Sequence, residues 1–132
     1  RNAIVGDTMI IYRMQNNRSQ GCYAGSYGNW ITREHCAPRC PSPENDGLNP
    51  YLLSHLFGFK DLSQLCAWFD HSELLRLSGI GFHIYAIELT DTCEVFHGTK
   101  QIVFDGERII SENKLDIDNV ACYYGLSNNA AC

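Results

Sequence analysis

The residues whose types suit chemistry best lie in the first half of the chain, and together they suit a nucleotide. An arginine such as Arg13 pairs readily with phosphate. Tyr23 and Tyr27, in a glycine-rich segment, offer ring faces that stack on a base. His35 and Asp46, in a proline-rich segment, can orient ribose hydroxyls or transfer a proton. No spacing rule forces these five residues together, so the alternative is that they are ordinary loop residues.

Phe59 is a further candidate for binding. It closes the motif Phe57-Gly58-Phe59, which ends the proline-rich segment and can line a pocket that this segment covers. The predicted ligand-binding residues are therefore Arg13, Tyr23, Tyr27, His35, Asp46 and Phe59.

Other motifs for catalysis and cofactor binding fail on their context. Gly79-Ile80-Gly81 precedes a predicted strand, whereas a dinucleotide fingerprint opens a helix. The sequence has no Walker loop, no His-Glu-x-x-His pair and no Gly-x-Ser-x-Gly elbow. We therefore assign no catalytic residue and no cofactor, and the sequence leaves open whether the protein is an enzyme.

The seven cysteines indicate reduced thiols. Their odd number and irregular spacing argue against a disulfide framework. A zinc site built from Cys22, His35, Cys36 and Cys40 would have suitable ligands. However, only Cys36 and Cys40 form a close pair, so we expect no metal site. No cysteine–histidine pair stands out as a catalytic dyad.

Composition bounds the class of protein. A net charge of −5 argues against general nucleic-acid binding. No apolar run reaches the ~18 residues of a membrane span, and we expect no membrane partner. An apolar content of 45% is typical of a folded domain. We expect residues 1–8 to be a tag or disordered leader, 9–121 to form one domain, and 122–132 to be a tail.

The clearest local pattern lies at residues 56–69. Leu56 to Phe59 reads as a strand-like entry. Asp61 then begins a helix, with Gln64 as the reciprocal member of a capping box. The buried face of that helix is predicted to contain Leu62, Leu65, Cys66 and Phe69, at positions i, i+3, i+4 and i+7.

The remaining elements are predicted from shorter signals. A strand over Met9–Met14 carries Arg13, and a long loop of about 20 residues holds all four prolines. Asp70 or Ser72 caps a second short helix that ends near Gly79. Phe82–Leu89 reads as a central strand. The strongest hairpin signal is Asp105-Gly106, flanked by strands 101–104 and 107–110. This order favours an α+β domain with one curved, mainly antiparallel sheet and one or two helices packed on it.

The chain resembles a family of small phage and prophage proteins over residues 9–105. The matching residues are Tyr12-Arg13, Gly21 with Tyr23, His35, Pro41-Ser-Pro43 with Asp46-Gly47, Phe57-Gly-Phe59 with Leu62, Gln64-Leu65 and Trp68-Phe69, Gly81-Phe82 with Tyr85, and Gln101 to Phe104. The resemblance implies a phage context and little about chemistry. We expect the protein to act in the host cytoplasm.

The layout is also similar to compact ADP-ribosyltransferase-like folds, in which an arginine or histidine on the first strand contacts NAD. Phe96-His-Gly-Thr99 is similar to the His-Gly-Thr of the diphtheria-toxin-like members, but only 33 residues follow it. A catalytic glutamate on a late strand is missing, and Glu88 and Glu107 are the only nominees. The similarity implies a nucleotide-binding fold at most.

Three functional classes follow from these observations. The first is a phage accessory protein that binds a nucleotide-type or NAD-like ligand, or a host defence component, and so counteracts host defence. The second is an ADP-ribosyltransferase-like enzyme acting on NAD. The third is an inhibitor of a host protein that uses no small molecule.

Overall fold

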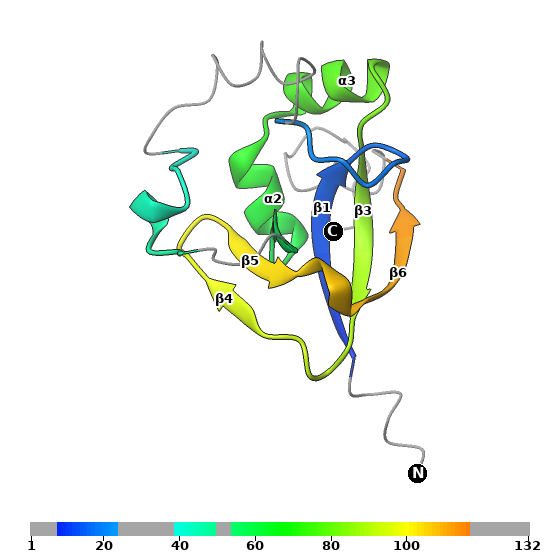
Figure 1. Cartoon of the computed structure of the whole chain (residues 1–132). Coiled ribbons are helices and arrows are strands. Elements are labelled where there is room, and N and C mark those ends of the chain that lie inside the picture. The colour runs from blue at the N-terminus through cyan, green and yellow to red at the C-terminus, as the bar shows by residue number, and fades with distance from the viewer. Residues whose placement is uncertain (1–7, 24–38, 50–53, 117–132) are drawn as a thin grey trace.

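Two small antiparallel sheets and two short helices make up the part of the chain that the structure describes (Figure 1). The structure is a computed structural model and describes residues 8–23, 39–49 and 54–116. The first sheet has the strand order β1 (Met9–Gln15), β3 (His83–Leu89) and β6 (Ile109–Lys114). The second has the order β2 (His55–Gly58), β5 (Ile102–Asp105) and β4 (Val95–His97).

The α+β class is confirmed, but the prediction of one curved sheet is wrong. The two sheets meet at a single bridge between Tyr12 of β1 and Phe59, just beyond β2. The Tyr12 amide donates to the Phe59 carbonyl at 2.9 Å, and the Phe59 amide donates to the Tyr12 carbonyl at 2.8 Å. A Cβ at Gly58 would lie 2.7 Å from the Tyr12 carbonyl oxygen. Glycine is therefore required at position 58 for the sheets to approach this closely.

Both helices begin at the predicted caps. Helix α2 (Leu62–Trp68) has Asp61 as its N-cap, with the side chain accepting from the Gln64 amide at 2.7 Å. The Gln64 side chain accepts from Lys60 and not from Asp61, so the capping box is only half formed. Helix α3 (His71–Gly79) has a complete box between Asp70 and Glu73.

Two buried clusters form the core. One lies between the helices and β1 and β3, where Leu65, Phe69, Leu74 and Leu77 pack together. The predicted helix face is largely confirmed, with Leu65 and Phe69 buried and Cys66 packed at the margin. The other cluster joins the two sheets and includes Ile11, Ile87, Ile102 and Phe104.

The predicted hairpin at Asp105-Gly106 does not form. Strand β5 ends at Asp105 and β6 begins at Ile109, but the two belong to different sheets, and the 3-10 turn Gly106–Arg108 leads from one to the other. The Gly106 amide donates to the Ser54 carbonyl at 2.8 Å, and a Cβ at Gly106 would lie 2.7 Å from Leu56 Cδ1. Gly106 therefore serves close packing against β2.

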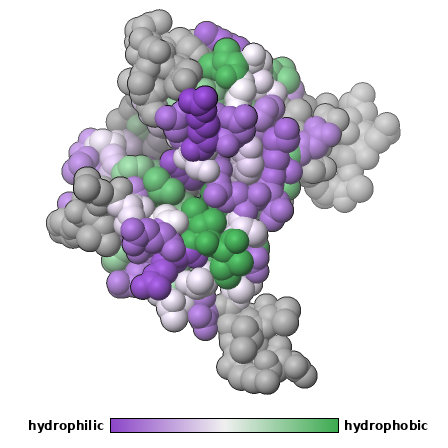
Figure 2. Space-filling model, turned by 45° about the vertical axis from the view of Figure 1, so that its right-hand side comes forward, coloured by the Kyte–Doolittle hydropathy of each residue, from purple (hydrophilic) through white to green (hydrophobic). Residues whose placement is uncertain are grey.

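The ADP-ribosyltransferase-like layout that the sequence suggested is not supported by these two small three-stranded sheets with two short helices. None of the helices in the described part of the chain has the length and hydropathy needed to cross a membrane. The face in Figure 2 is mostly hydrophilic, with hydrophobic residues confined to small patches.

Candidate functional site

An apolar pocket of about 260 Å³ lies where β1, β2 and the end of α2 meet. The described residues that line it are 13–14, 21–23, 55–59, 68–69 and 101. The Tyr12–Phe59 bridge draws β2 against β1 and so brings these segments, distant in sequence, to one place. Ligand sites are commonly apolar cavities with a few fixed polar groups.

Arg13 is the most unusual of the lining residues. It is only 8% exposed, and within the described part of the chain its guanidinium takes part in no hydrogen bond or ion pair. Its Nη2 lies 3.1 Å from the point where a Cβ at Gly21 would stand, so Gly21 leaves room for the cation. Burial lowers the pKa of Arg13 below its ordinary value. Glu112 attracts this charge and partly offsets the burial, but burying a charge without a hydrogen-bonded partner is costly.

Aromatic rings form one wall of the pocket. The Phe59 ring lies 5.6 Å from the Trp68 ring and 5.9 Å from the Phe69 ring, both in tilted or edge-on geometry. Phe57 also lines the pocket and is 39% exposed, which gives the site an accessible ring face. Such rings hold planar ligands by stacking and by apolar contact.

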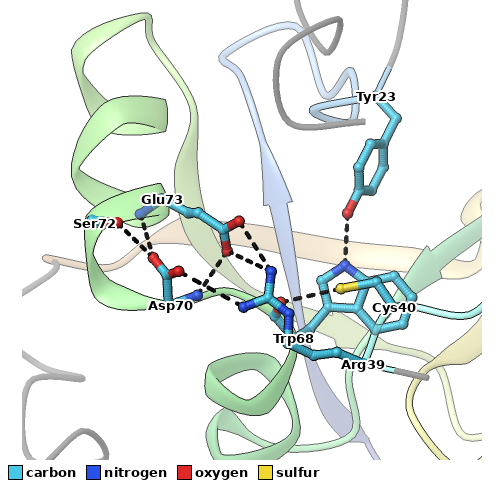
Figure 3. A network of polar contacts seen from close by, with 7 residues as sticks. All are labelled: Tyr23, Arg39, Cys40, Trp68, Asp70, Ser72 and Glu73. Carbon is cyan, nitrogen blue, oxygen red and sulfur yellow. Dashed lines mark hydrogen bonds and ion pairs between the residues drawn. The ribbon is translucent and has the colours of Figure 1, made fainter. Parts of the chain in front are cut away.

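Tyr23 is fixed to this wall by its hydroxyl, which accepts a hydrogen bond from Trp68 Nε1 at 2.6 Å (Figure 3). The residue as a whole is 43% exposed, but its hydrogen bond with Trp68 is partly buried, and this burial raises the pKa of Tyr23 well above its ordinary range. The neighbouring Cys22 is 2% exposed, and burial raises its pKa to about 12. Its thiol is therefore protonated at neutral pH and unsuited to nucleophilic chemistry.

A polar network anchors the segment at Arg39 and Cys40 to the helices (Figure 3). Arg39 Nη2 lies 3.1 Å from Glu73 Oε2, and Nη1 lies 3.7 Å from Asp70 Oδ2. The Cys40 thiol donates to the Trp68 carbonyl at 3.3 Å. Trp68 thus holds both Tyr23 and Cys40 beside the pocket.

Asp46 organises the turn between β4 and β5. It lies in a short 3-10 turn (Glu44–Asp46), and its carboxylate accepts from the backbone amides of Thr99, Lys100 and Gln101 at 2.8–3.2 Å. A Cβ at Gly98 would overlap this carboxylate, at 2.3 Å from Oδ2. This turn positions Gln101, which is 5% exposed, in the pocket wall.

A second hollow of about 390 Å³ adjoins the apolar pocket. The two share Tyr23, Phe57, Trp68 and Gln101, and the second adds residues 40–43. The shared residues make the two hollows one continuous surface with room for more than a single ring system.

Three of the six predicted site residues line the apolar pocket together, namely Arg13, Tyr23 and Phe59. Asp46 is not among the lining residues and reaches the pocket only through Gln101. Tyr27 and His35 lie outside the described residues. Among the described residues no group of three or more metal-ligating side chains is found, and His35 and Cys36 of the considered zinc set lie outside them.

Sequence reasoning missed Gln101, Trp68 and Cys22. Trp68 was not on the predicted apolar face of the helix, yet it is buried in the core and also lines the pocket. Gln101 had one available signal, since a glutamine directly before the apolar run 102–104 can be expected to be buried and then has to be hydrogen-bonded.

Comparisons with known proteins place the chain in a phage context. The model of a protein family described as bacteriophage T4 Y00F protein matches residues 9–118. No curated protein and no solved structure matches the chain.

Proposed function

The chain belongs to the bacteriophage T4 Y00F protein family, and from this premise we propose that it is an accessory protein that binds a nucleotide-type ligand of the host cell. The ligand site is the apolar pocket around Arg13. Acting in the host cytoplasm, the protein sequesters its ligand and so counteracts a host defence that depends on it.

One observation carries this proposal: the buried guanidinium of Arg13 lacks an acceptor among the described residues. A phosphate or carboxylate that enters the pocket would supply the missing acceptor and neutralise the charge. Hydrogen bonds between arginine and such anions are strong and geometrically specific, because the guanidinium can donate two parallel bonds. In the free protein, removing the Arg13 charge from water costs free energy. Ligand binding offsets this cost.

The shape and composition of the pocket support a planar group attached to the anion. Phe57 and Phe59, two positions apart, both contribute aromatic rings to the pocket lining, and the Trp68 ring packs against Phe59 in the same wall. A volume of about 260 Å³ is near the lower end of small-molecule sites, which span roughly 300–1,000 Å³. The hollow that adjoins it gives space for a sugar.

The lining favours binding over turnover. No carboxylate lines the pocket in the described part of the chain, and the thiol of Cys22 is held neutral. His55 is the one described lining residue with an imidazole, and no carboxylate or reactive thiol lies beside it among the lining residues. We therefore expect the ligand to be returned unchanged.

The test is mass spectrometry of small molecules released when protein purified from infected cells is denatured. We expect a nucleotide-type anion, and the same compound should raise the melting temperature of the purified protein. Arg13→Met should abolish the rise, and Arg108→Met, which changes an exposed arginine outside the pocket, should retain it. An empty release spectrum, together with no thermal shift from a nucleotide panel, would overturn the proposal.

A protein partner is the second candidate, favoured by one feature of the second sheet. Phe57 and Phe96 both face Val103 in register, so they lie on the same side of the sheet, and they are 39% and 45% exposed. Exposed aromatic residues that share a face mark interaction surfaces. Capture of one host defence protein that is lost with Phe96→Ser but kept with Arg13→Met would favour this candidate over the first.

A further inference from the structure

We infer that Gln101 selects the ligand by accepting a hydrogen bond from an N–H group of its base. The inference rests on the proposed function and adds a specificity-determining residue, together with the chemistry that this residue requires of the ligand.

The orientation of the Gln101 amide follows from its one bonded neighbour. Gln101 Nε2 donates to the Pro41 carbonyl at 3.1 Å. A carbonyl oxygen can only accept, so the nitrogen end of the amide must face Pro41 and the oxygen end must face away. Within the described part of the chain, Oε1 accepts no hydrogen bond. Gln101 is 95% buried and lines both hollows, and from this placement we take its free acceptor to be available to a ligand there.

The backbone of Gln101 is held as firmly as its side chain. Its amide donates to Asp46 Oδ2 at 3.1 Å, and its carbonyl accepts from the Gly98 amide at 2.9 Å. The amides of Thr99 and Lys100 are bound to the same carboxylate. Because both its backbone and its side-chain nitrogen are hydrogen-bonded, Gln101 holds its remaining acceptor in one direction. Ligand binding therefore does not have to order this side chain, which would cost free energy.

Gln101 and Arg13 are opposite in hydrogen-bonding character. Arg13 has only donors, whereas the free atom of Gln101 is only an acceptor. A ligand that satisfies both must carry an anion at one end and an N–H donor at the other, with a body that fits between aromatic side chains. Nucleotides whose bases carry an amino or imino N–H meet this description, and a base without any N–H leaves Oε1 unpaired.

The test compares five nucleoside 5′-monophosphates on the unmodified protein by isothermal titration calorimetry. Four carry adenine, guanine, cytosine or uracil, and the fifth carries unsubstituted purine, which has no N–H on its base when attached to ribose. We expect the best of the four to bind roughly tenfold to a hundredfold more tightly than the purine compound, as for a lost hydrogen bond to a buried group. Gln101→Leu should reduce that ratio to below about threefold, and Asn113→Leu, which removes an exposed amide on β6, should preserve it.

The outcomes separate the two proposals. If the purine compound binds as tightly as the best of the four, or if Gln101→Leu keeps the ratio, Gln101 does not read the base, although the pocket still binds nucleotides. If none of the five binds the unmodified protein, the proposed function fails for mononucleotides and the role of Gln101 fails with it. The comparison of ligands on the unmodified protein does not depend on the stability of any variant.

Discussion

The indole N–H of Trp68 and the hydroxyl of Tyr23 form a 2.6 Å hydrogen bond that joins the end of α2 to the turn after β1. These two residues are 45 positions apart and form adjacent parts of the pocket wall. Loss of this bond is therefore expected to change both the stability of the fold and the shape of the pocket.

Tyr23→Phe is expected to lower the free energy of unfolding by about 1 kcal/mol, the typical net worth of one such hydrogen bond. Urea denaturation followed by circular dichroism measures it. Tyr85→Phe is the matched control, because the Tyr85 hydroxyl has no hydrogen bond within the described part of the chain. Equal losses from both variants would contradict a specific role for the Trp68 bond.

Arg13→Met is expected to raise the free energy of unfolding of the ligand-free protein by about 1–3 kcal/mol. Methionine has a similar length and no charge to desolvate, and apolar replacements of buried charges are often stabilising. Thermal denaturation of the ligand-free protein is the measurement. A fall in the melting temperature would show that Arg13 stabilises the ligand-free fold, and this would contradict the prediction.

Gly58→Ala and Gly79→Ala should have opposite effects. The first places a methyl group 2.7 Å from the Tyr12 carbonyl oxygen and should cost about 2 kcal/mol or more. The second places a methyl group in open space at the end of α3 and should gain about 0.5 kcal/mol, because alanine restricts the unfolded chain. Parallel urea titrations decide the matter, and a neutral Gly58→Ala would mean that the two sheets are not held as closely as described.

Asp46→Asn should destabilise the β4–β5 turn. The carboxylate serves three backbone amides, and an asparagine has a single acceptor oxygen with which to replace it. We expect a loss of about 2 kcal/mol in the free energy of unfolding and faster hydrogen exchange at Thr99–Gln101. Asp91→Asn, at an exposed position, should change neither measurement. Unchanged exchange at these amides in Asp46→Asn would contradict the clamp.

Acid should weaken the capping box of α3. Burial raises the pKa of Asp70, but hydrogen bonds from Glu73 and Ser72 outweigh it and hold the pKa below its ordinary value. The folded protein therefore favours the charged form. The resulting stabilisation is complete above the unfolded-state pKa of about 3.9 and is lost as the pH falls from there through the folded-state pKa.

Asp70→Asn keeps a good N-cap but cannot ionise, so its stability should fall less between pH 5 and pH 2, to be measured by urea titrations across that range. Parallel pH profiles for the variant and the unmodified protein would exclude a contribution from Asp70.

Much of the local structure was predictable because its causes are local. The cap at Asp61, the box at Asp70 and the strands around Arg13 and Ile87 follow from side chains within a few positions of one another. The hairpin prediction was wrong because Ile102, Val103 and Phe104 are all buried, as in a strand that is covered on both faces. Burial of this apolar run determines which strand β5 pairs with, and the turn signal of Asp105-Gly106 does not. The left-handed residue after α3 is Gly81, not the predicted Gly79, since the helix runs further than expected.

The site was predictable by residue type but not by geometry. Arg13 was conspicuous because a charged residue on an apolar strand needs a reason. The role of Asp46 depends on amides more than 50 positions away, and no spacing within the sequence encodes that contact. The same holds for Gln101, whose side-chain orientation depends on the Pro41 carbonyl.

The pairing of β1 with β3 has a consequence for synthesis on the ribosome. Met9 pairs with Leu89 and Gln15 with His83, so in the described part of the chain the first strand to be made finds its neighbour some 70–80 residues later. Until then Ile10, Ile11 and Tyr12 have no sheet to join, and unpaired apolar strands of this kind aggregate. At the bacterial rate of about 20 residues per second, several seconds pass before the first sheet can close. Rapid synthesis would therefore raise the number of chains in which this first strand is still unpaired.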